Sequence, residues 1–328
     1  MPDFNEFFLM KPEDAKRYAV EVLHRFAPDE ETECIEIGDG NINYVYKVWS
    51  KKDGHSVIIK QADKLLRSSG RPLDLYRNKI EATILQLEGR LAPGYVPEVY
   101  YYDEVMAATS MEDVSAYGNL RKELMANRVY AHLAENMSSF LVDSLFPTTD
   151  LVMASDEKKK NVKFFINPEL CDISEDLVLS EPYMAVPYRE RNKNIVFPGN
   201  EEFVEENLYK DEALHCEVAK LRDRFMNCAQ ALVHGDLHSG SIFANADGLK
   251  VLDPEFAFYG PMGYAGTEII RRVVGDSKVM GVTSVKEADK RILMERALIK
   301  IGKALIMQRE TISSGREIVE MFRAVIAE

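Results

Sequence analysis

A run rich in β-branched and aromatic side chains, residues 34–63, limits the folds open to this chain. Two clusters of turn-forming residues, GDGN at 38–41 and KKDGH at 51–55, divide the run into three parts. Because strands favour such side chains and tight turns favour Gly, Asn and Asp, the run predicts an antiparallel meander of three strands. Two more strand-like segments, 96–102 and 107–111, follow a helical pattern at 73–91.

The pattern changes after residue 112, where apolar side chains recur at helical spacing. We therefore predict an α+β fold with two lobes, a β-rich N-terminal lobe at 1–112 and a larger, mainly α lobe at 113–328. An amphipathic helix is expected at 11–26, before the strands. Residues 181–200 lack periodicity and are expected to form a loop.

The composition excludes several classes of partner. A net charge of -13 disfavours nucleic acid and anionic membranes, which reward a basic surface. The acidic start and the lack of an apolar run near ~18 residues predict a cytoplasmic protein without a secretory signal or membrane span. The four cysteines have no CxxC spacing and are expected to be reduced thiols.

The segment VHGDLHSGSI at 233–242 is the most specific for chemistry. Phosphoryl transfer needs an acceptor oxygen aimed in line and neutralised phosphate charge, with little covalent participation by the protein. Asp236 can accept a hydroxyl proton, and Ser241, five residues later, is expected to face the metal region. We therefore predict Asp236 as the catalytic base.

The segment LKVLDPEF at 249–256 indicates a strand that ends in two carboxylates. At positions i and i+2 of an extended chain, Asp253 and Glu255 project to the same side and can share a divalent cation. Oxygen ligands favour Mg²⁺, so we predict a magnesium site at Asp253, Glu255 and Ser241.

His234 and His238 form an HxxxH pair, which is also a zinc pattern. The Gly-Asp-Leu loop between them gives no shared helical face, so we do not expect zinc. His234 is expected to be structural, with its ring bonded to the backbone of the loop that it begins.

Two N-terminal features suit phosphate binding, and neither is decisive alone. The turn at 38–41 would let backbone N–H groups approach a phosphate, yet an ordinary hairpin turn requires the same residues. Lys60, in the strand-like SVIIK, is placed to reach the α- and β-phosphates, although such lysines are usually only solvated. Glu81, in the following helix, would fix Lys60 by an ion pair; a solvated helix face is the alternative reading of Glu81 alone.

In this order, the glycine turn, strand lysine, helix glutamate, HGD loop and acidic segment resemble the protein-kinase-like phosphotransferases, which include aminoglycoside, choline and methylthioribose kinases. Within that group, GDGNINYVYKV, VIIKQA, MEDVS, NPELCDISEDLV, HGDLHSGSIF and DPEFAFYGPMG resemble the 5-methylthioribose kinases over most of the chain. The resemblance implies a bilobal protein-kinase-like fold. It also implies Mg²⁺-dependent transfer of the γ-phosphoryl group of ATP to the 1-hydroxyl of 5-methylthioribose, a step of methionine salvage, in a homodimer.

The resemblance also implies roles for individual residues. The ATP-binding set would comprise Gly38, Asp39, Gly40, Asn41 and Asn43 over the phosphates, Lys60 with Glu81, and Met111, Glu112 and Asp113 as the hinge beside adenine. The acceptor-binding set would comprise Asn41, Asp236, Arg271 and Arg272.

One segment departs from the family. Here Gly263 continues directly into Tyr264 and the GTEIIRR motif, whereas the family places several helices between these segments. The acceptor lobe is therefore expected to be shortened after Gly263. This leaves a second interpretation open, an ATP-binding pseudokinase that is catalytically impaired.

The charge distribution bears on the acceptor. From Tyr264 to the end, 12 Lys and Arg residues stand against 9 Asp and Glu residues, so this segment is basic although the whole chain is acidic. A cationic aminoglycoside or choline would favour an acidic, aromatic acceptor site, whereas arginines suit a neutral sugar that becomes a sugar phosphate. Choline, aminoglycosides and homoserine remain the alternative acceptors.

Overall fold

The computed structural model describes residues 3–38, 42–65, 70, 72–186, 194–261, 263–275 and 279–327. By compactness the chain divides into two units, one of residues 1–170 and 231–259 and the other of residues 171–230 and 260–328. This division differs from the predicted lobes 1–112 and 113–328. The predicted lobe boundary at residue 112 was placed where the sequence pattern changes from strand-like to helical, and it stays a prediction.

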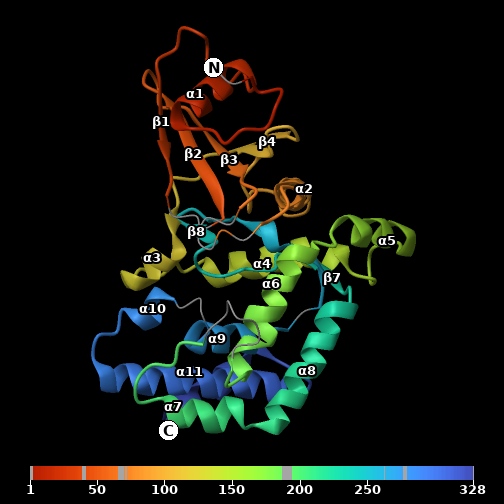
Figure 1. The fold of residues 1–328 in the computed structure, drawn as a ribbon, viewed down its shortest axis with the longest axis vertical. Coiled ribbons are helices and arrows are strands. Elements are labelled where there is room, and N and C mark those ends of the chain that lie inside the picture. The colour runs from red at the N-terminus through yellow and green to blue at the C-terminus, as the bar shows by residue number, and fades with distance from the viewer. Residues whose placement is uncertain are drawn as a thin grey trace. The chain divides into compact units, whose positions relative to one another are not determined.

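The first unit contains a five-stranded antiparallel sheet in the order β1-β2-β3-β5-β4 (Figure 1). Its strands are β1 (Thr32–Glu36), β2 (Asn43–Ser50), β3 (Ser56–Ala62), β4 (Val99–Asp103) and β5 (Ala108–Met111). The predicted three-stranded meander is confirmed, since β1 pairs with β2 and β2 with β3 in antiparallel register. β5 then pairs with β3, and β4 forms the edge.

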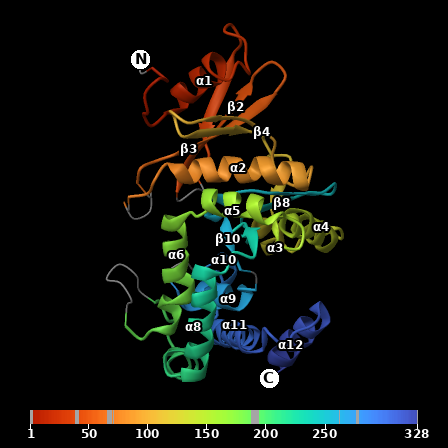
Figure 2. The same cartoon turned by 90° about the vertical axis from the view of Figure 1, so that its right-hand side faces the viewer.

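Two helices flank this sheet (Figure 2). α1 (Pro12–Glu21) packs with side chains of β2 and β3 such as Tyr46 and Val57, and its first turn is capped by the Asp14 carboxylate, which accepts from the Lys11 N–H. α2 (Tyr76–Leu91) packs through Leu85 in a second cluster that includes Met111 of β5. Since the side chains of a strand alternate in direction, the two clusters take up opposite faces of the sheet.

The first unit also contains short strands and helices. They are β6 (Gly118–Asn119), α3 (Leu120–Met125), α4 (Leu133–Leu145), α5 (Ser155–Phe164), β7 (Ala231–Val233), β8 (Ile242–Ala244), β9 (Leu249–Val251) and β10 (Phe258–Gly260). β6, β8 and β9 form one small sheet and β7 and β10 another. The loop before β8 and the turn after β9 carry the HGD and DPE residues.

The second unit is helical in its described residues. Its helices are α6 (Pro168–Leu179, which begins in the first unit), α7 (Glu201–Val204), α8 (Glu212–Asn227), α9 (Ala265–Val274), α10 (Met280–Thr283), α11 (Ala288–Gln308) and α12 (Gly315–Ala327). Its core joins α8, α9 and α11 through side chains such as Leu214, Ile270 and Ile299. Within the predicted loop 181–200, the described residues form only a 3₁₀ turn at Glu181–Tyr183.

Taken together, the antiparallel sheet of the first unit and the helices of both units confirm the predicted α+β fold class.

Candidate active site

Lys60 is held on β3 by pairing on both sides, with Val45 opposite it on β2 and Thr109 opposite it on β5. Val57 and Ile59 pack on the α1 side of the sheet. Because strand side chains alternate, Lys60 projects to the other face. Only 5% of Lys60 is exposed, so its ammonium needs negative partners.

Two carboxylates from distant parts of the chain supply these partners. Lys60 Nζ lies 2.6 Å from Glu81 Oε1 of α2 and 2.7 Å from Asp253 Oδ1, just after β9. Burial alone would lower the pKa of Lys60, but Asp253 and Glu81 raise it above its ordinary value, so the ammonium stays charged. The ion pair that the resemblance implied is thus present, and its role toward ATP stays a prediction.

The surrounding carboxyl groups respond differently to burial and to Lys60. Burial raises the pKa of Glu81 and of Glu255, and the Lys60 ammonium opposes this shift in both. Burial acts in the same direction on Asp253, but there the Lys60 ammonium prevails and holds the pKa of that carboxyl below its usual range. The Asp253 side chain is 48% exposed, so this charged carboxylate is accessible to a partner.

The backbone at Asp253 and Glu255 differs from the prediction. β9 ends at Val251, Asp253 is left-handed with φ 61° and ψ 45°, and Pro254–Phe256 form a 3₁₀ turn. The prediction of an extended chain with carboxylates at i and i+2 was wrong. Asp tolerates the left-handed region better than most residues, and Pro254 fixes φ for the following turn. The turn, rather than a strand, brings both carboxylates within the influence of Lys60.

The HGD loop packs directly against this turn. Gly235 has φ 83°, and a Cβ added to it would lie 2.0 Å from the backbone oxygen of Phe256. Only glycine allows this approach, because it tolerates positive φ and has no side chain to collide. The contact holds the backbone next to Asp236 against the backbone next to Glu255.

His234 links the same two segments. Its Nε2 donates to the Leu252 carbonyl at 2.9 Å, and the charges of Asp236 and Asp253 both act on its buried ring. Burial lowers the pKa of His234, so the ring is neutral. The ring therefore bonds the chain just before Asp253, and the prediction of a bond to its own loop was wrong.

Asp236 lies at the open side of the loop, with 27% of its side chain exposed. Its Oδ2 is 3.5 Å from His238 Nε2. The Gly240 N–H donates to His238 Nδ1 at 2.9 Å, which leaves the ring proton on Nε2, facing Asp236. Ser241 Oγ donates to the Asp236 carbonyl at 3.3 Å. An accessible carboxylate next to a charged cluster has the chemistry of a general base.

The glycine turn is described only in part. Gly38 follows β1, while Asp39, Gly40 and Asn41 lie outside the described residues. Asn43 begins β2, is 2% exposed, and donates from Nδ2 to Glu255 Oε2 at 2.7 Å. Asn43 therefore lies beside a predicted metal ligand.

The predicted hinge follows β5, which ends at Met111. Glu112 Oε2 accepts from Lys250 Nζ at 2.9 Å, and Asp113 Oδ2 lies 2.7 Å from Lys47 Nζ. Burial alone would raise the pKa of Asp113, but its hydrogen bonds, first that from Lys47, lower it to about 2. Both hinge carboxylates thus have partners within the protein, and the place of this segment beside adenine stays a prediction.

The donor set fits a magnesium ion. Asp253 and Glu255 offer carboxylate oxygens. The charges of both carboxylates act on Lys60, so both groups belong to one cluster. Mg²⁺ in proteins is usually held by one or two carboxylates together with phosphate oxygens and water. The Ser241 hydroxyl is bonded to the Asp236 carbonyl, so Ser241 stays a predicted ligand only.

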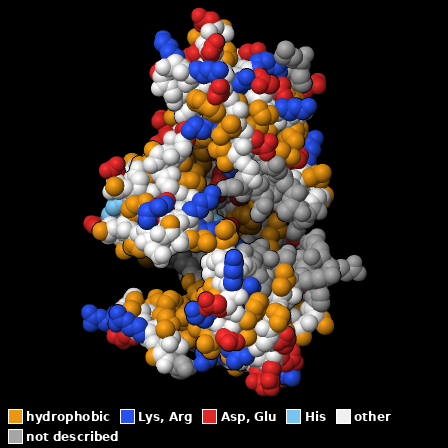
Figure 3. Space-filling model, turned by 90° about the vertical axis from the view of Figure 1, so that its left-hand side faces the viewer, with side chains coloured by type: hydrophobic (Ala, Val, Ile, Leu, Met, Phe, Trp, Pro, Cys, Tyr) orange, Lys and Arg blue, Asp and Glu red, His pale blue; other side chains and the backbone are white. Residues whose placement is uncertain are grey.

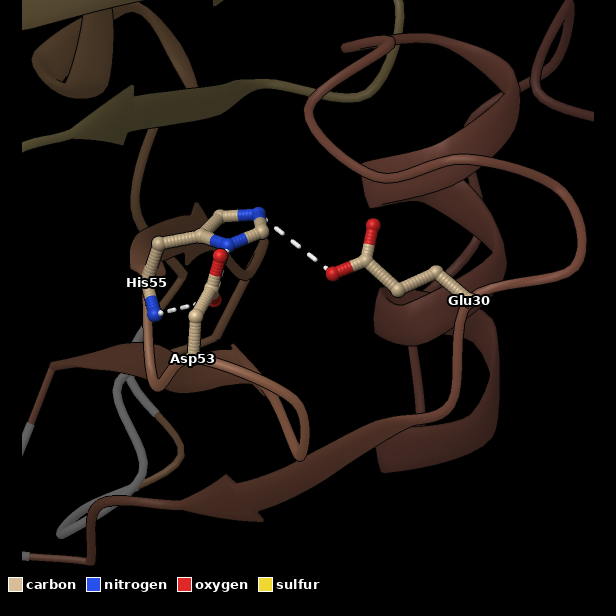
Figure 4. Close-up of side chains that lie close together, drawn as sticks. All are labelled: Glu30, Asp53 and His55. Carbon is tan, nitrogen blue, oxygen red and sulfur yellow. Dashed lines mark hydrogen bonds and ion pairs between the residues drawn. The ribbon is translucent and has the colours of Figure 1, made fainter.

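Among the described residues, one group of three His, Cys, Asp or Glu side chains has ligand atoms close enough to share an ion, namely Glu30, Asp53 and His55 (Figure 4). His55 Nδ1 faces the Asp53 carboxylate, and Nε2 faces the Arg25 carbonyl. Two acceptors require two ring protons, and a doubly protonated ring has no lone pair for a metal. We interpret this group as an ion pair that fastens the β2–β3 turn.

The predicted arginine pair belongs to the second unit. Arg271 and Arg272 lie on α9, with their Nε atoms 3.2 Å and 3.5 Å from Glu268 Oε2. Their contact with an acceptor stays a prediction.

Sequence reasoning missed Arg77, a buried cation on the first turn of α2 whose guanidinium lies beside Asn43. Arg77 and Glu81 are four residues apart and therefore share a helix face, which is the signal that identifies Arg77 in retrospect.

No family model matches this chain. A methylthioribose kinase of Geobacillus sp. (strain WCH70) is 32% identical over 367 residues, covering 89% of this chain and 90% of that protein. A methylthioribose kinase of Geobacillus kaustophilus (strain HTA426) is 33% identical over 369 residues, covering 90% and 91%. Among solved structures, a spectinomycin phosphotransferase in complex with ADP and spectinomycin has a TM-score of 0.46 and 12% identity, covering 97% of this chain and 94% of that chain.

Both alignments span more positions than the 328 residues of this chain, so both relatives carry residues without a counterpart here. The place of the shortening, after Gly263, stays a prediction.

Proposed function

Because this chain belongs to the methylthioribose kinase family, we propose that it uses ATP to phosphorylate 5-methylthioribose at its 1-hydroxyl, giving 5-methylthioribose 1-phosphate. The observation that carries the mechanism is the buried Lys60 ammonium between Glu81 and Asp253. A cation fixed by two carboxylates from separate segments is pre-oriented for an anionic ligand.

The proposed roles follow from chemistry at named atoms. Asp236 accepts the proton of the acceptor hydroxyl as that oxygen attacks the γ-phosphorus. Lys60 binds phosphate oxygens, and Glu81 keeps it aimed. Asp253 and Glu255 are the proposed ligands of Mg²⁺, which neutralises phosphate charge when bound. Gly38 to Asn43 would lie over the phosphates and Met111 to Asp113 beside adenine.

Two grounds support methylthioribose as the acceptor: the family to which the chain belongs and the charge of its C-terminal segment. Arg271 and Arg272 lie in the basic C-terminal segment, and guanidinium groups suit a sugar that becomes a phosphate monoester. We also propose a role in methionine salvage, a cytoplasmic location and a homodimer. No helix in the described part of the chain has the length and apolar character needed to cross a bilayer.

The direct test is an acceptor panel. Purified protein with Mg-ATP is incubated with methylthioribose, choline, an aminoglycoside or homoserine, and ADP and the phosphorylated product are measured. We expect turnover with methylthioribose. Turnover with another acceptor alone would refute the acceptor assignment, and nucleotide binding without turnover on any of them would favour a pseudokinase.

Replacing the base separates catalysis from nucleotide binding. Asp236→Asn should lower kcat by about 10²–10⁴-fold with little change in ATP affinity, because a base acts mainly in the transition state. Asp247→Asn, in the exposed turn between β8 and β9, is the control and should leave kcat unchanged. An equal loss of nucleotide binding in Asp236→Asn would contradict the assigned role.

A further inference from the structure

Arg77 is a buried arginine beside the candidate site that the predicted set does not include. Only 3% of it is exposed. Its Nη1 donates to the Asp74 carbonyl at 2.8 Å, and its Nη2 donates to the Asp63 carbonyl at 2.8 Å and to Asn43 Oδ1 at 3.2 Å. Burying a guanidinium has a large desolvation cost, which its hydrogen bonds and neighbouring carboxylates must offset.

The contact with Asn43 decides the orientation of an amide. A side-chain amide accepts at one end and donates at the other, and Arg77 can only donate. Asn43 Oδ1 must therefore face Arg77, which turns Nδ2 toward Glu255, where it donates to Oε2 at 2.7 Å. The Glu255 carboxylate, which can only accept, favours the same orientation, so Arg77 adds a second hydrogen bond that holds the amide in place at its oxygen end.

Arg77 also contributes charge to a cluster that is short of cations. Lys60 pairs with Glu81 and Asp253, and the charge of Glu255 acts on it as well. The charges of Glu255 and Glu81 also act on the Arg77 guanidinium. Arginine stays protonated even when buried, so Arg77 is a second permanent positive charge beside these carboxylates.

We propose that Arg77 is a positioning residue of the predicted magnesium site: it fixes the Asn43 amide, which in turn holds Glu255 in the orientation that binds the metal. The inference rests on the proposed kinase function. Arg77 acts through Asn43 and not by contact with ATP or the acceptor. Groups that orient a metal ligand typically change metal affinity by about 10–100-fold.

The test measures nucleotide binding rather than turnover. ADP binding is followed by calorimetry over a Mg²⁺ titration for the wild type, Arg77→Lys and Asn43→Ser. Lysine keeps the charge but lacks the fork that reaches a carbonyl and Asn43 together. We expect the Mg²⁺ midpoint to rise about 10-fold or more in both variants. Lys79→Met is the control, since Lys79 is a half-exposed cation on the same helix that pairs with Glu104.

A double-variant cycle decides whether Arg77 acts through Asn43. If it does, Arg77→Lys/Asn43→Ser should have the same Mg²⁺ midpoint as Asn43→Ser alone, because the relay is already broken. If the fold-change of the Mg²⁺ midpoint in the double variant equals the product of the fold-changes in the two single variants, the proposal is overturned. An Arg77→Lys variant whose thermal midpoint falls while its Mg²⁺ titration matches the wild type would also overturn it, because that pattern belongs to a purely structural contact. If Arg77→Lys does not fold, a wild-type Mg²⁺ midpoint in Asn43→Ser overturns it as well.

The outcome is separable from that of the proposed function. If the wild type binds Mg-ADP but leaves methylthioribose unphosphorylated, the acceptor assignment is refuted. The Mg²⁺ midpoints of ADP binding in the single and double variants still test the role of Arg77.

Discussion

At the scale of single residues, Gly235 determines whether the HGD loop and the DPE turn can meet. We predict that Gly235→Ala destabilises the fold by about 1–3 kcal/mol, through strain at positive φ, and lowers kcat further by displacing Asp236. Urea unfolding and steady-state kinetics measure the two effects. Gly248→Ala is the matched control, since a Cβ there meets nothing within 4 Å. Equal stability and kcat in Gly235→Ala and Gly248→Ala would contradict the close approach.

His55 makes a contribution to stability that depends on pH. The hydrogen bond to Asp53 raises the pKa of His55 in the folded protein. A group with a raised folded pKa stabilises fully below its unfolded pKa, about 6.5, and loses that effect as pH rises through the folded value. The Tm difference between wild type and His55→Gln should therefore be largest below about pH 6 and shrink at higher pH.

The Asp53→Asn variant supplies the comparison for this pH dependence. Asp53→Asn removes the partner that raises the pKa of His55. The Tm difference between Asp53→Asn and His55→Gln should therefore vary less with pH than the Tm difference between the wild type and His55→Gln. A wild-type advantage that grows above pH 8 would contradict the doubly protonated ring.

At the scale of elements, α9 and α11 cross at two glycines. A Cβ on Gly302 would lie 2.6 Å from Ile270 Cγ1, and one on Gly266 would lie 2.5 Å from the Gly302 carbonyl. Intrinsic helix propensity favours alanine over glycine by about 1 kcal/mol, whereas overpacking costs about 1–3 kcal/mol. We expect overpacking to prevail, so Gly302→Ala should lower the urea midpoint.

Gly281→Ala in α10 is the matched helical control for this test, because a Cβ at Gly281 meets nothing within 4 Å. It should be neutral or stabilising. A Gly302→Ala variant at least as stable as Gly281→Ala would show that the two helices separate at little cost.

The elements also differ in how far local patterns predicted them. Strands β1 to β3 follow from composition and turn residues, which are local properties. The helical stretch after residue 117 is divided into α3 and α4, and Asn127 between them has φ 56°. A left-handed residue ends a helix, yet apolar periodicity continues across it and hides the break. Pro168 stands at the first position of α6, where proline is favoured because its missing N–H costs nothing there.

At the scale of the whole molecule, the face drawn in Figure 3 carries side chains of both signs, although the sequence as a whole is acidic. Acidic and basic side chains are interspersed there among hydrophobic ones. A stripe of basic side chains that could follow a nucleic acid is not visible on that face, and the small acceptor proposed for the protein requires none.

The sequence by itself determined the meander of β1 to β3, the residue types of the site and the family, because turn chemistry, periodicity and contiguous motifs are properties of neighbouring residues. It also determined that Lys60, Glu81, Asp236 and Asp253 were the residues to examine. Only the tertiary structure decided the left-handed turn at Asp253, the contact of Gly235 with Phe256, and the relay from Arg77 through Asn43 to Glu255. These depend on how segments far apart in the chain pack together, which no local pattern encodes.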